Sequence, residues 1–344
     1  MIRFECDYGE GAHPLILERL VETNFEQTPG YGEDVHCARA RELIRDICCR
    51  DSADVHFLVG GTQANMTVIA SILRPHQGVI AASTGHISIH ETGAIEATGH
   101  KVIELPPTDG KITSVQVESV HARHWSDTAH EHIVQPGMVY ISNPTETGTI
   151  YSLSELQSLS EVCRRLGLPL FLDGARLGYA LEADGNDLTL PDIAELCDVF
   201  YIGGTKIGAL FGEAVVITAE RLKPDFRYLI KQRGGMLAKG RLLGIQFETL
   251  FTDGLYFEIS RHAVSMAMLI RDALTAHKIP LYCQSPTNQQ FPILTRRQID
   301  VLSLKYAFET WTPLDDDRSA VRFCTSWATR EEDVRALVED IRKL

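Results

Sequence analysis

Short, continuously apolar runs alternate with segments of helical periodicity along the first two thirds of this chain. The runs that read as strands cover residues 55–59, 79–82, 102–105, 138–142, 170–172, 199–202 and 214–217. Strands that are apolar on both faces are typical of parallel sheets covered by helices on both sides. The alternation therefore predicts an α/β fold with a doubly wound, mostly parallel sheet.

The pattern changes in the last hundred residues. A long helical stretch over residues 255–277 is followed by short strand candidates at 291–294 and 321–324 and by a final helix. We therefore expect two parts. Residues 1–245 carry N-terminal helices and a large α/β domain, and residues 246–344 form a smaller α+β domain.

Two helix starts carry a capping-box sequence, in which a Ser or Thr is followed three residues later by a Glu that returns the hydrogen bond. Ser152 with Glu155 predicts the start of a helix, and Gly167 stands where a helix-ending glycine is expected. Thr329 with Glu332 predicts the start of the terminal helix.

Charge and composition exclude several classes of protein. The 33 basic and 46 acidic residues give a net charge of −13, which argues against a nucleic-acid partner. No apolar run is long enough to span a membrane, and the acidic N-terminus does not resemble a signal peptide. The eight cysteines form no CxxC pair and the histidines match no zinc spacing, so we expect a cytoplasmic enzyme without a metal.

Three turns at the ends of predicted strands carry residues suited to chemistry. Gly60-Gly61-Thr62-Gln63 opens a helix, and is either a phosphate cradle or an ordinary glycine turn. Asp173 ends a strand where sheet ligands bind, although an acid there also caps helices. Lys206 follows a strand and two glycines, and is either a solvated residue or an amine nucleophile at the rim of a pocket.

The order of these three features fits one cofactor. Pyridoxal 5′-phosphate (PLP) needs an anion cradle, an acid beside its ring nitrogen and an amine with which its aldehyde forms a Schiff base. The sequence therefore predicts a PLP site with an amino acid as its small-molecule substrate.

The chain also resembles the threonine aldolase/β-eliminating lyase family of fold-type I PLP enzymes. The resemblance runs along most of the chain and is carried by Cys6-Asp7, Tyr31-Gly32-Glu33-Asp34, Gly61-Thr62-Gln63-Ala64-Asn65, Gly85-His86, Asp173-Gly174-Ala175-Arg176, Thr205-Lys206, Gly234-Gly235-Met236 and Val321-Arg322. The GTQAN and DGAR strings, in this order, are its most specific part. The resemblance implies a homodimer or homotetramer with shared active sites.

The resemblance assigns roles at the cofactor. Lys206 matches the Schiff-base lysine, Asp173 the partner of the ring nitrogen, and His86 the histidine that stacks on the ring. The phosphate turn matches Gly61, Thr62 and Gln63. The basic residue that follows the GGM string in the family is shifted here, with Arg233 before the string and Lys239 after it, and we expect either of them to reach a neighbouring subunit's phosphate.

The resemblance also assigns residues at the substrate. Arg176 and Arg322 match the arginines that hold the substrate carboxylate, a task suited to a bidentate guanidinium. Tyr31 matches a tyrosine near the substrate. Cys6 departs from the family pattern, because it stands where threonine aldolases usually have a serine.

A second departure leaves the catalytic base open. Where the family carries a histidine after an Asn-Thr pair, this chain has Asn143-Pro144-Thr145-Glu146. The candidates for the base are His86 or His90 directly, or a water held by them or by Glu91.

The resemblance implies an aldolase that cleaves a β-hydroxy-α-amino acid of the threonine, allo-threonine or phenylserine type to glycine and an aldehyde. An alternative is a lyase that β-eliminates a leaving group from another amino acid at the same site. A hypothesis from a different class is a PLP-binding protein without turnover. Such a protein would be expected to lack Lys206 or Asp173, and both are present.

Overall fold

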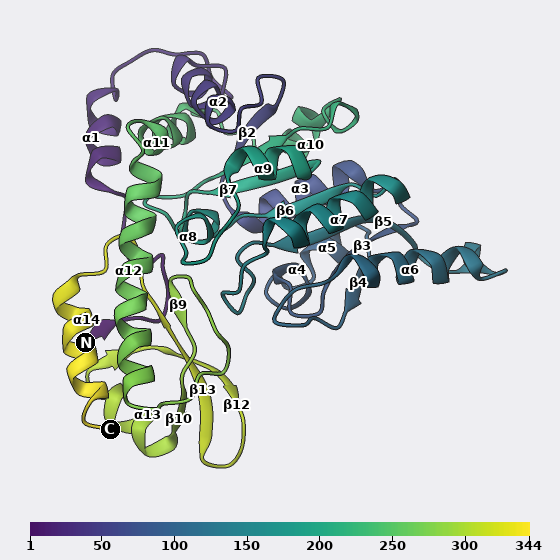
Figure 1. Ribbon diagram of the computed structural model, residues 1–344. Helices are drawn as coiled ribbons and strands as arrows, with labels where there is room; N and C mark the ends of the chain where they lie inside the picture. The colour runs from purple at the N-terminus through teal and green to yellow at the C-terminus, as the bar shows by residue number, and fades with distance from the viewer.

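Seven strands form the central sheet of the computed structural model, which describes residues 1–344 (Figure 1). They are β2 (Asp54–Leu58), β3 (Gln77–Ala82), β4 (Val102–Leu105), β5 (Gln135–Ser142), β6 (Leu170–Asp173), β7 (Val199–Gly203) and β8 (Glu213–Ile217). Their order is β2-β8-β7-β6-β5-β3-β4. Only β8 is antiparallel to its neighbours, β2 and β7. The predicted α/β fold with a mostly parallel sheet is confirmed.

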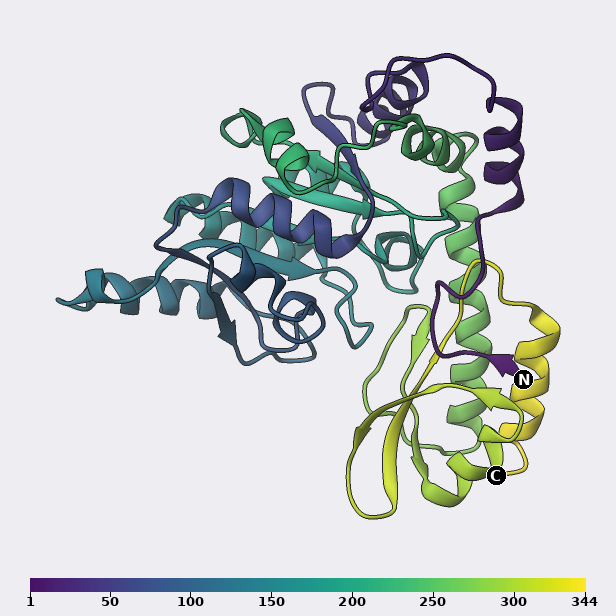
Figure 2. The same cartoon turned by 180° about the vertical axis from the view of Figure 1, so that it is seen from behind.

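Successive side chains of the central strands enter two different apolar layers. In β6, Leu170 and Leu172 pack on one side of the sheet and Phe171 packs on the other. Each such side chain stabilises the fold by roughly 1.5–3 kcal/mol relative to an exposed position. Three helices that contribute to the first layer are α6 (Ser114–Ser126), α7 (Leu153–Leu166) and α9 (Leu190–Leu196). The second layer includes α3 (Gly61–Ile72), α5 (Ala94–Ala97) and α10 (Phe226–Gln232), as Figures 1 and 2 show from opposite sides.

The large part has five further α-helices. They are α1 (Pro14–Glu22), α2 (Val35–Ile47), α4 (His86–Ile89), α8 (Leu177–Leu181) and α11 (Arg241–Phe251), with two 3₁₀ helices at His130–His132 and Glu220–Leu222. α2 and α11 approach closely at Gly244, where an added Cβ would lie 2.5 Å from the Cys37 nitrogen. This contact anchors the N-terminal helices to the large part.

The C-terminal part is a small antiparallel sheet covered by helices. Its strands are β9 (Gln289–Gln290), β10 (Ile293–Thr295), β12 (Glu309–Pro313) and β13 (Arg318–Cys324). Its helices are the C-terminal half of α12 (Leu255–Ala276), α13 (Arg296–Ser303) and α14 (Glu331–Ile341), and α12 also packs on the large part (Figure 1).

The N-terminus joins this C-terminal part. β1 (Ile2–Arg3) pairs in parallel with β11 (Tyr306–Ala307), so both chain ends lie in the same region (Figure 1). The predicted division at residue 245 falls within α11 and remains a prediction, and the β1–β11 pairing crosses it.

One predicted helix start is confirmed and the other is wrong. Ser152 and Glu155 form the expected capping box of α7, which ends at Gly167 in the left-handed conformation (φ 70°). α14 begins instead at Glu331, because the Thr329 hydroxyl accepts the Ser326 N–H at 2.7 Å and does not cap the helix.

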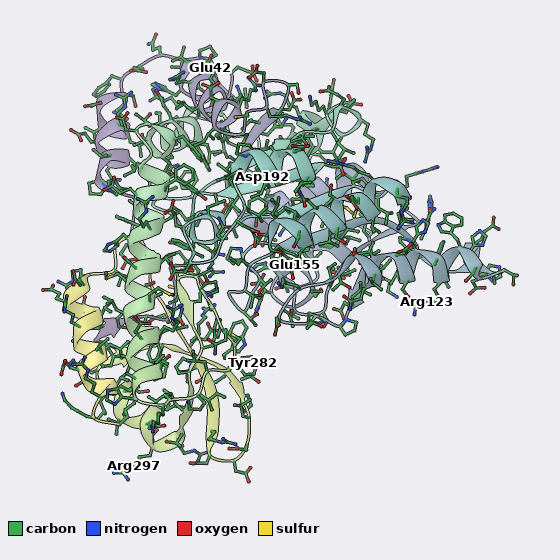
Figure 3. The ribbon with its side chains drawn as sticks, in the orientation of Figure 1. Glu42, Arg123, Glu155, Asp192, Tyr282 and Arg297 are labelled. Carbon is green, nitrogen blue, oxygen red and sulfur yellow. The ribbon has the colours of Figure 1, made fainter.

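The surface carries charged side chains that point away from the sheet, as Glu42, Arg123 and Arg297 do in Figure 3. None of the helices is both long enough and apolar enough to cross a membrane.

Candidate active site

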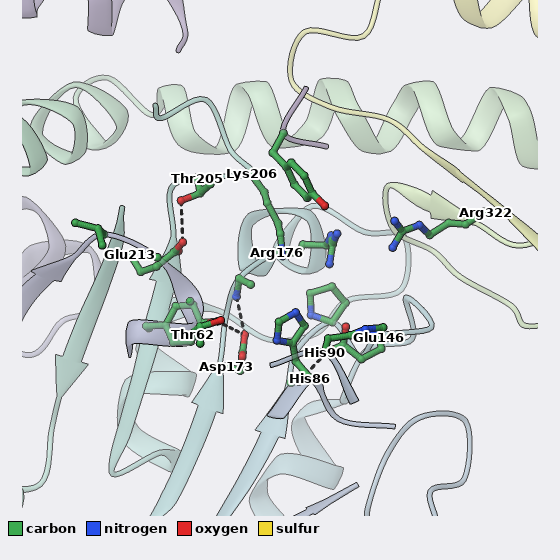
Figure 4. A pocket seen from close by; sticks show the side chains of 18 of the residues that line it. Thr62, His86, His90, Glu146, Asp173, Arg176, Thr205, Lys206, Glu213 and Arg322 are labelled. Atoms are coloured by element: carbon green, nitrogen blue, oxygen red, sulfur yellow. Dashed lines mark hydrogen bonds between the residues drawn. The ribbon is translucent and has the colours of Figure 1, made fainter. Parts of the chain in front are cut away.

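A cleft of about 510 Å³ lies at the carboxyl ends of the parallel strands, next to β12 and β13. Its walls come from the segments after β2, β3, β5, β6 and β7 and from the C-terminal sheet (Figure 4). Open α/β sheets bind ligands at this edge. The predicted site residues that line the cleft are Gly61, Thr62, His86, Asp173, Arg176, Lys206 and Arg322.

The turn between β2 and α3 presents free backbone donors to the cleft. Gly60 is extended and precedes the helix, and no acceptor in the chain takes the N–H groups of Gly61, Thr62 or Gln63. An added Cβ at Gly61 would lie 3.1 Å from the Tyr201 hydroxyl, so glycine allows the close approach. Free N–H groups at the positive end of a helix dipole favour an anion.

Asp173 ends β6 and is buried at the base of the cleft. The Tyr140 hydroxyl donates to its carboxylate at 2.5 Å, the Ala175 N–H donates at 3.0 Å, and the Tyr201 hydroxyl donates as well. Burial opposes ionisation, but the His86 charge and these donors outweigh it and hold the pKa of Asp173 below its usual value. The carboxylate is therefore ionised at neutral pH.

His86 begins α4 and is held by a buried carboxylate. Its Nδ1 lies 2.7 Å from Glu91 Oε1. The Asn65 amide donates to the same oxygen at 2.7 Å and to Asp173 at 3.1 Å, which links the two acids. Burial alone would lower the pKa of His86, but the Glu91 hydrogen bond and the Glu146 charge help to raise it above its usual value. This favours the cationic form of the ring.

Lys206 reaches the cleft from the loop after β7, and its Nζ makes no hydrogen bond or ion pair within the chain. Burial and the nearby Arg176 charge lower the pKa of its amine. The charges of Asp7, Glu146 and Asp173 oppose this shift in part. A larger neutral fraction makes the amine a better nucleophile.

Thr205 and Glu213 form the wall beside Lys206. The Thr205 hydroxyl donates to Glu213 Oε1 at 2.8 Å, and the Gly204 N–H donates to Oε2 at 3.2 Å. Burial raises the pKa of Glu213 to about 8. Glu213 is therefore mainly protonated at neutral pH and adds little negative charge to the cleft.

Arg176 is fixed by a carboxylate from the start of the chain. Its Nε and Nη2 donate to the two oxygens of Asp7 at 2.6 and 3.0 Å, and the Asn288 amide donates to Asp7 at 2.9 Å. Burial opposes the ionisation of Asp7, but the Arg176 charge outweighs it and lowers the pKa of Asp7 to about 2. The pair holds the guanidinium in one orientation at the wall of the cleft.

Arg322 lies on β13, on the C-terminal side of the cleft. Its guanidinium donates to Gln289 and to the Glu5 carbonyl, both at 3.0 Å, and pairs with Glu309. It also lies 5.6 Å from the centre of the Trp311 ring. The two arginines thus enter the cleft from different parts of the molecule.

Five predicted site residues lie outside the lining of this cleft. Gln63 donates to the Arg233 carbonyl at 3.0 Å and accepts from the Val59 N–H, so its side chain braces the turn. Cys6 precedes Asp7 without lining the cleft. Tyr31 lines a separate small pocket, and Lys239 lines another. The roles given to these residues remain predictions.

Several residues that shape the site were not assigned a role from the sequence. They are Asp7, Asn65, Tyr140, Glu146, Tyr201 and Glu213. Asp7, Asn65 and Glu146 stand inside segments quoted above, Glu146 in the one where the family carries a histidine, so that position was the available signal. Tyr140, Tyr201 and Glu213 stand in apolar strands, where nothing in the local sequence separates a site residue from a core residue.

Comparisons with known proteins agree with this geometry. The family model described as beta-eliminating lyase matches residues 14–322. The low specificity L-threonine aldolase of Pseudomonas sp. (strain NCIMB 10558) is 30% identical over 344 residues, which cover 99% of this chain and 97% of that protein. The solved structure of Leishmania major threonine aldolase superposes with a TM-score of 0.97 at 49% identity, covering 100% of this chain and 99% of that one.

A more distant structure shows how widely the fold is shared. An aspartate aminotransferase mutant from Thermus thermophilus superposes with a TM-score of 0.73 at 15% identity, covering 100% of this chain and 92% of that one. The fold is that of the fold-type I PLP enzymes. Since the family model covers most of the chain and the Pseudomonas relative is similar over nearly all of it, the protein belongs to the beta-eliminating lyase family.

Proposed function

We propose that this protein is a PLP-dependent aldolase that cleaves a β-hydroxy-α-amino acid of the threonine type to glycine and an aldehyde. The observation that carries the proposal is the meeting of three features in one cleft. These are the unpaired N–H groups of α3, the ionised Asp173 and the unpartnered amine of Lys206. The similarity to proteins named threonine aldolases supports the substrate class.

The residues around the cleft fit PLP. The N–H groups at Gly61 and Thr62 would hold the phosphate. The Asp173 carboxylate would hold a proton on the ring nitrogen, and His86 would stack on the ring. Lys206 would supply the amine to which the cofactor is attached. When bound, PLP supplies a sink for the electrons of a bond that breaks at the Cα of an amino acid.

The arginines set the orientation of the substrate. Arg176 and Arg322 would donate charge-assisted hydrogen bonds to its carboxylate. Because Asp7 fixes Arg176 and the C-terminal sheet fixes Arg322, the carboxylate is held from two sides. A carboxylate held in this way would fix which bond at Cα is broken. Holding the reacting groups in one geometry lowers the barrier to reaction.

The function is tested by the products formed from L-threonine, L-allo-threonine and phenylserine. We expect the PLP-loaded protein to release glycine and the matching aldehyde in equal amounts from at least one of them. Lys206→Ala should abolish release, whereas Lys101→Ala, at an exposed lysine, should not change it. A 2-oxo acid with ammonium in place of glycine would indicate β-elimination, and the absence of any product from all three would contradict the proposal.

We also propose that the chain works as a homodimer or homotetramer with shared active sites. Tyr31, Arg233 and Lys239 lie outside their own chain's cleft, and the Tyr31 N–H donates to the Ala238 carbonyl at 3.2 Å. Tyr31 and Lys239 therefore lie on neighbouring loops. A second copy placed against these loops would bring their basic groups to its own phosphate turn.

Exposed apolar side chains support an interface in the same region. Phe25 is 93% exposed, Val35 is 66% exposed and Tyr228 is 76% exposed. Tyr31 lies 4.7 Å below Lys231, which shares helix α10 with Tyr228. Clusters of exposed apolar residues mark interaction surfaces.

Sedimentation is expected to show at least a dimer. Phe25→Asp should weaken the assembly and its activity together, whereas Leu304→Asp, at an equally exposed leucine of the C-terminal part, should leave both unchanged. Co-expression of an Asp173→Asn chain with an Arg233→Ala, Lys239→Ala chain should restore activity, since one site of the hybrid dimer is then intact. A fully active monomer would contradict the proposal.

We further propose a cytoplasmic location for the protein. All eight cysteines are free in the structure. Free thiols without disulfides are typical of a reducing compartment.

A further inference from the structure

We propose that Glu146 is the catalytic base that takes the proton from the substrate's β-hydroxyl group during cleavage, an inference that rests on the proposed aldolase function. Glu146 was not among the candidates from the sequence, which were His86, His90 and a water held by them or by Glu91. The structure separates Glu146 from the other acids and from His86 by what already occupies or covers their polar atoms, and from His90 by the charges around that ring.

The other carboxylates around the cleft are hydrogen-bonded or ion-paired to neighbours, or are covered by them. Asp173 accepts bonds from two hydroxyl groups, an amide and a backbone N–H. Glu91 does not line the cleft, because its side chain is fully covered; its Oε1 bonds Asn65 and His86, and its Oε2 is buried without a partner. Glu213 accepts bonds from its own loop, and Glu309 is paired with an arginine. Glu146 accepts one long bond, from Ser142 at 3.3 Å, and therefore has oxygen lone pairs free for a substrate.

The loop that carries Glu146 is braced from both sides. The Thr145 N–H donates to the Thr149 carbonyl at 2.8 Å, and their hydroxyl oxygens lie 2.6 Å apart. An added Cβ at Gly148 would lie 2.2 Å from the Ser285 hydroxyl, so the loop also packs tightly on the C-terminal part. A base must be held at a fixed place to act on one proton, and this loop fixes the backbone of Glu146.

Glu146 also lies in the right part of the cleft. Its side chain groups with those of His86 and His90, facing Arg176 and Lys206 (Figure 4). The charge of Glu146 acts on all four of these groups. A substrate bound through its amino group near Lys206 and its carboxylate at the arginines would direct its remaining substituent, which carries the β-hydroxyl, toward Glu146.

The two histidines are less suited to this step. His86 is held by Glu91 and favours its cationic form, which has no free lone pair on the ring. His90 lies between His86 and Trp311, with ring centres 5.5 and 6.3 Å away. Burial lowers the pKa of His90, and together with the charges of His86 and Arg322 it outweighs the opposite effect of Glu146 and Glu309, so a cation at His90 is disfavoured. Glu146 becomes neutral on taking the proton.

The β O–H bond breaks and its proton forms a bond to a Glu146 oxygen, while the O–H electron pair becomes the second C–O bond of the aldehyde. The Cα–Cβ bond breaks and its electron pair remains with Cα. Cα then takes a proton from water to give glycine, and Glu146 returns its proton to water.

Glycine has no β-hydroxyl group, so exchange of its α-proton needs the cofactor and the rest of the site but not the proposed base. Comparing this exchange with threonine cleavage therefore isolates the role of Glu146. The experiment measures threonine cleavage and α-proton exchange of glycine in D₂O by NMR, with the PLP absorbance as a third readout. For Glu146→Gln we expect cleavage to fall by about 10²- to 10⁴-fold, the range of general base catalysis. Glycine exchange and PLP binding should stay near the wild-type level, and Glu146→Asp should recover part of the cleavage.

Two variants serve as comparisons. His90→Asn should lower cleavage far less than Glu146→Gln, and Glu118→Gln, at an exposed glutamate, should change nothing. Unchanged cleavage in Glu146→Gln would overturn the role of Glu146. An equal fall of cleavage and exchange would also overturn it, because Glu146 would then support the site as a whole. If wild-type protein exchanges glycine but does not cleave, the proposed function fails and this role fails with it.

Discussion

Asp173→Asn is expected to keep PLP bound but to lower kcat for cleavage by roughly 10²- to 10³-fold, the loss typical of removing one preorganised electrostatic group. The substitution preserves the shape of the side chain but removes the charge that would hold the proton on the ring nitrogen. That charge matters most when the bond at Cα breaks, so its loss is expected in kcat. The measurement compares kcat, KM and bound PLP with those of wild type.

The surroundings of Asp173 make this variant interpretable. With the new amide nitrogen at the Oδ2 position, the Tyr140 hydroxyl can rotate to accept its hydrogen bond, while Tyr201 and the Ala175 N–H keep their acceptor at Oδ1. The Asn65 amide loses this acceptor but keeps its bond to Glu91. Asp184→Asn, at an exposed aspartate, is a matched control and should retain full activity. Full activity of Asp173→Asn would show that the carboxylate does not act on the ring nitrogen.

Arg322→Lys is expected to raise KM by roughly ten- to a hundredfold, the range for losing a hydrogen bond to a charged group. Lysine keeps the positive charge but lacks the planar pair of donors that matches a carboxylate. A smaller loss of kcat is expected as well, because a substrate held only by Arg176 has more freedom to tilt. Steady-state kinetics with threonine provide the measurement.

Arg297→Lys is the matched control for this prediction, since Arg297 is exposed on α13 away from the cleft. It should leave KM unchanged. If Arg322→Lys also leaves KM unchanged, the substrate carboxylate is held elsewhere, and Asp7→Asn, which removes the partner of Arg176, would then identify the other arginine as the principal contact.

The sheet could be predicted from the sequence because its signal is local. A strand such as β6 is buried on both faces, so its successive residues are apolar and the run can be recognised without knowing which strands lie beside it. The capping boxes show the limit of local signals. The Ser152 hydroxyl accepts the Glu155 N–H and caps α7. The Thr329 hydroxyl instead accepts the Ser326 N–H, so the same sequence pattern does not cap α14.

The site was predictable in part for the same reason. Asp173 ends β6 and Lys206 stands in the loop after β7, so the fold places them at one edge of the sheet. Asp7 bonds Arg176 from 169 residues away, and no spacing in the sequence encodes that pair. The role of Glu146 depends on which other acids are already hydrogen-bonded, which only the assembled cleft determines.

Residues that the proposed assembly places between subunits form a separate class. Tyr31 and Lys239 lie in pockets other than the cleft. The cleft that they would complete belongs to a second subunit. The hybrid dimer described above tests this placement for Arg233 and Lys239. The roles of Lys206 and Asp173 within one chain do not depend on its result.

The central claim is that Lys206 carries PLP in this cleft. The most direct test is to load the protein with PLP, record the visible absorbance band, reduce with borohydride and map the labelled peptide by mass spectrometry. We predict a yellow protein with one labelled residue per chain, at Lys206. A label on any other lysine, or no bound PLP after reconstitution, would contradict the account.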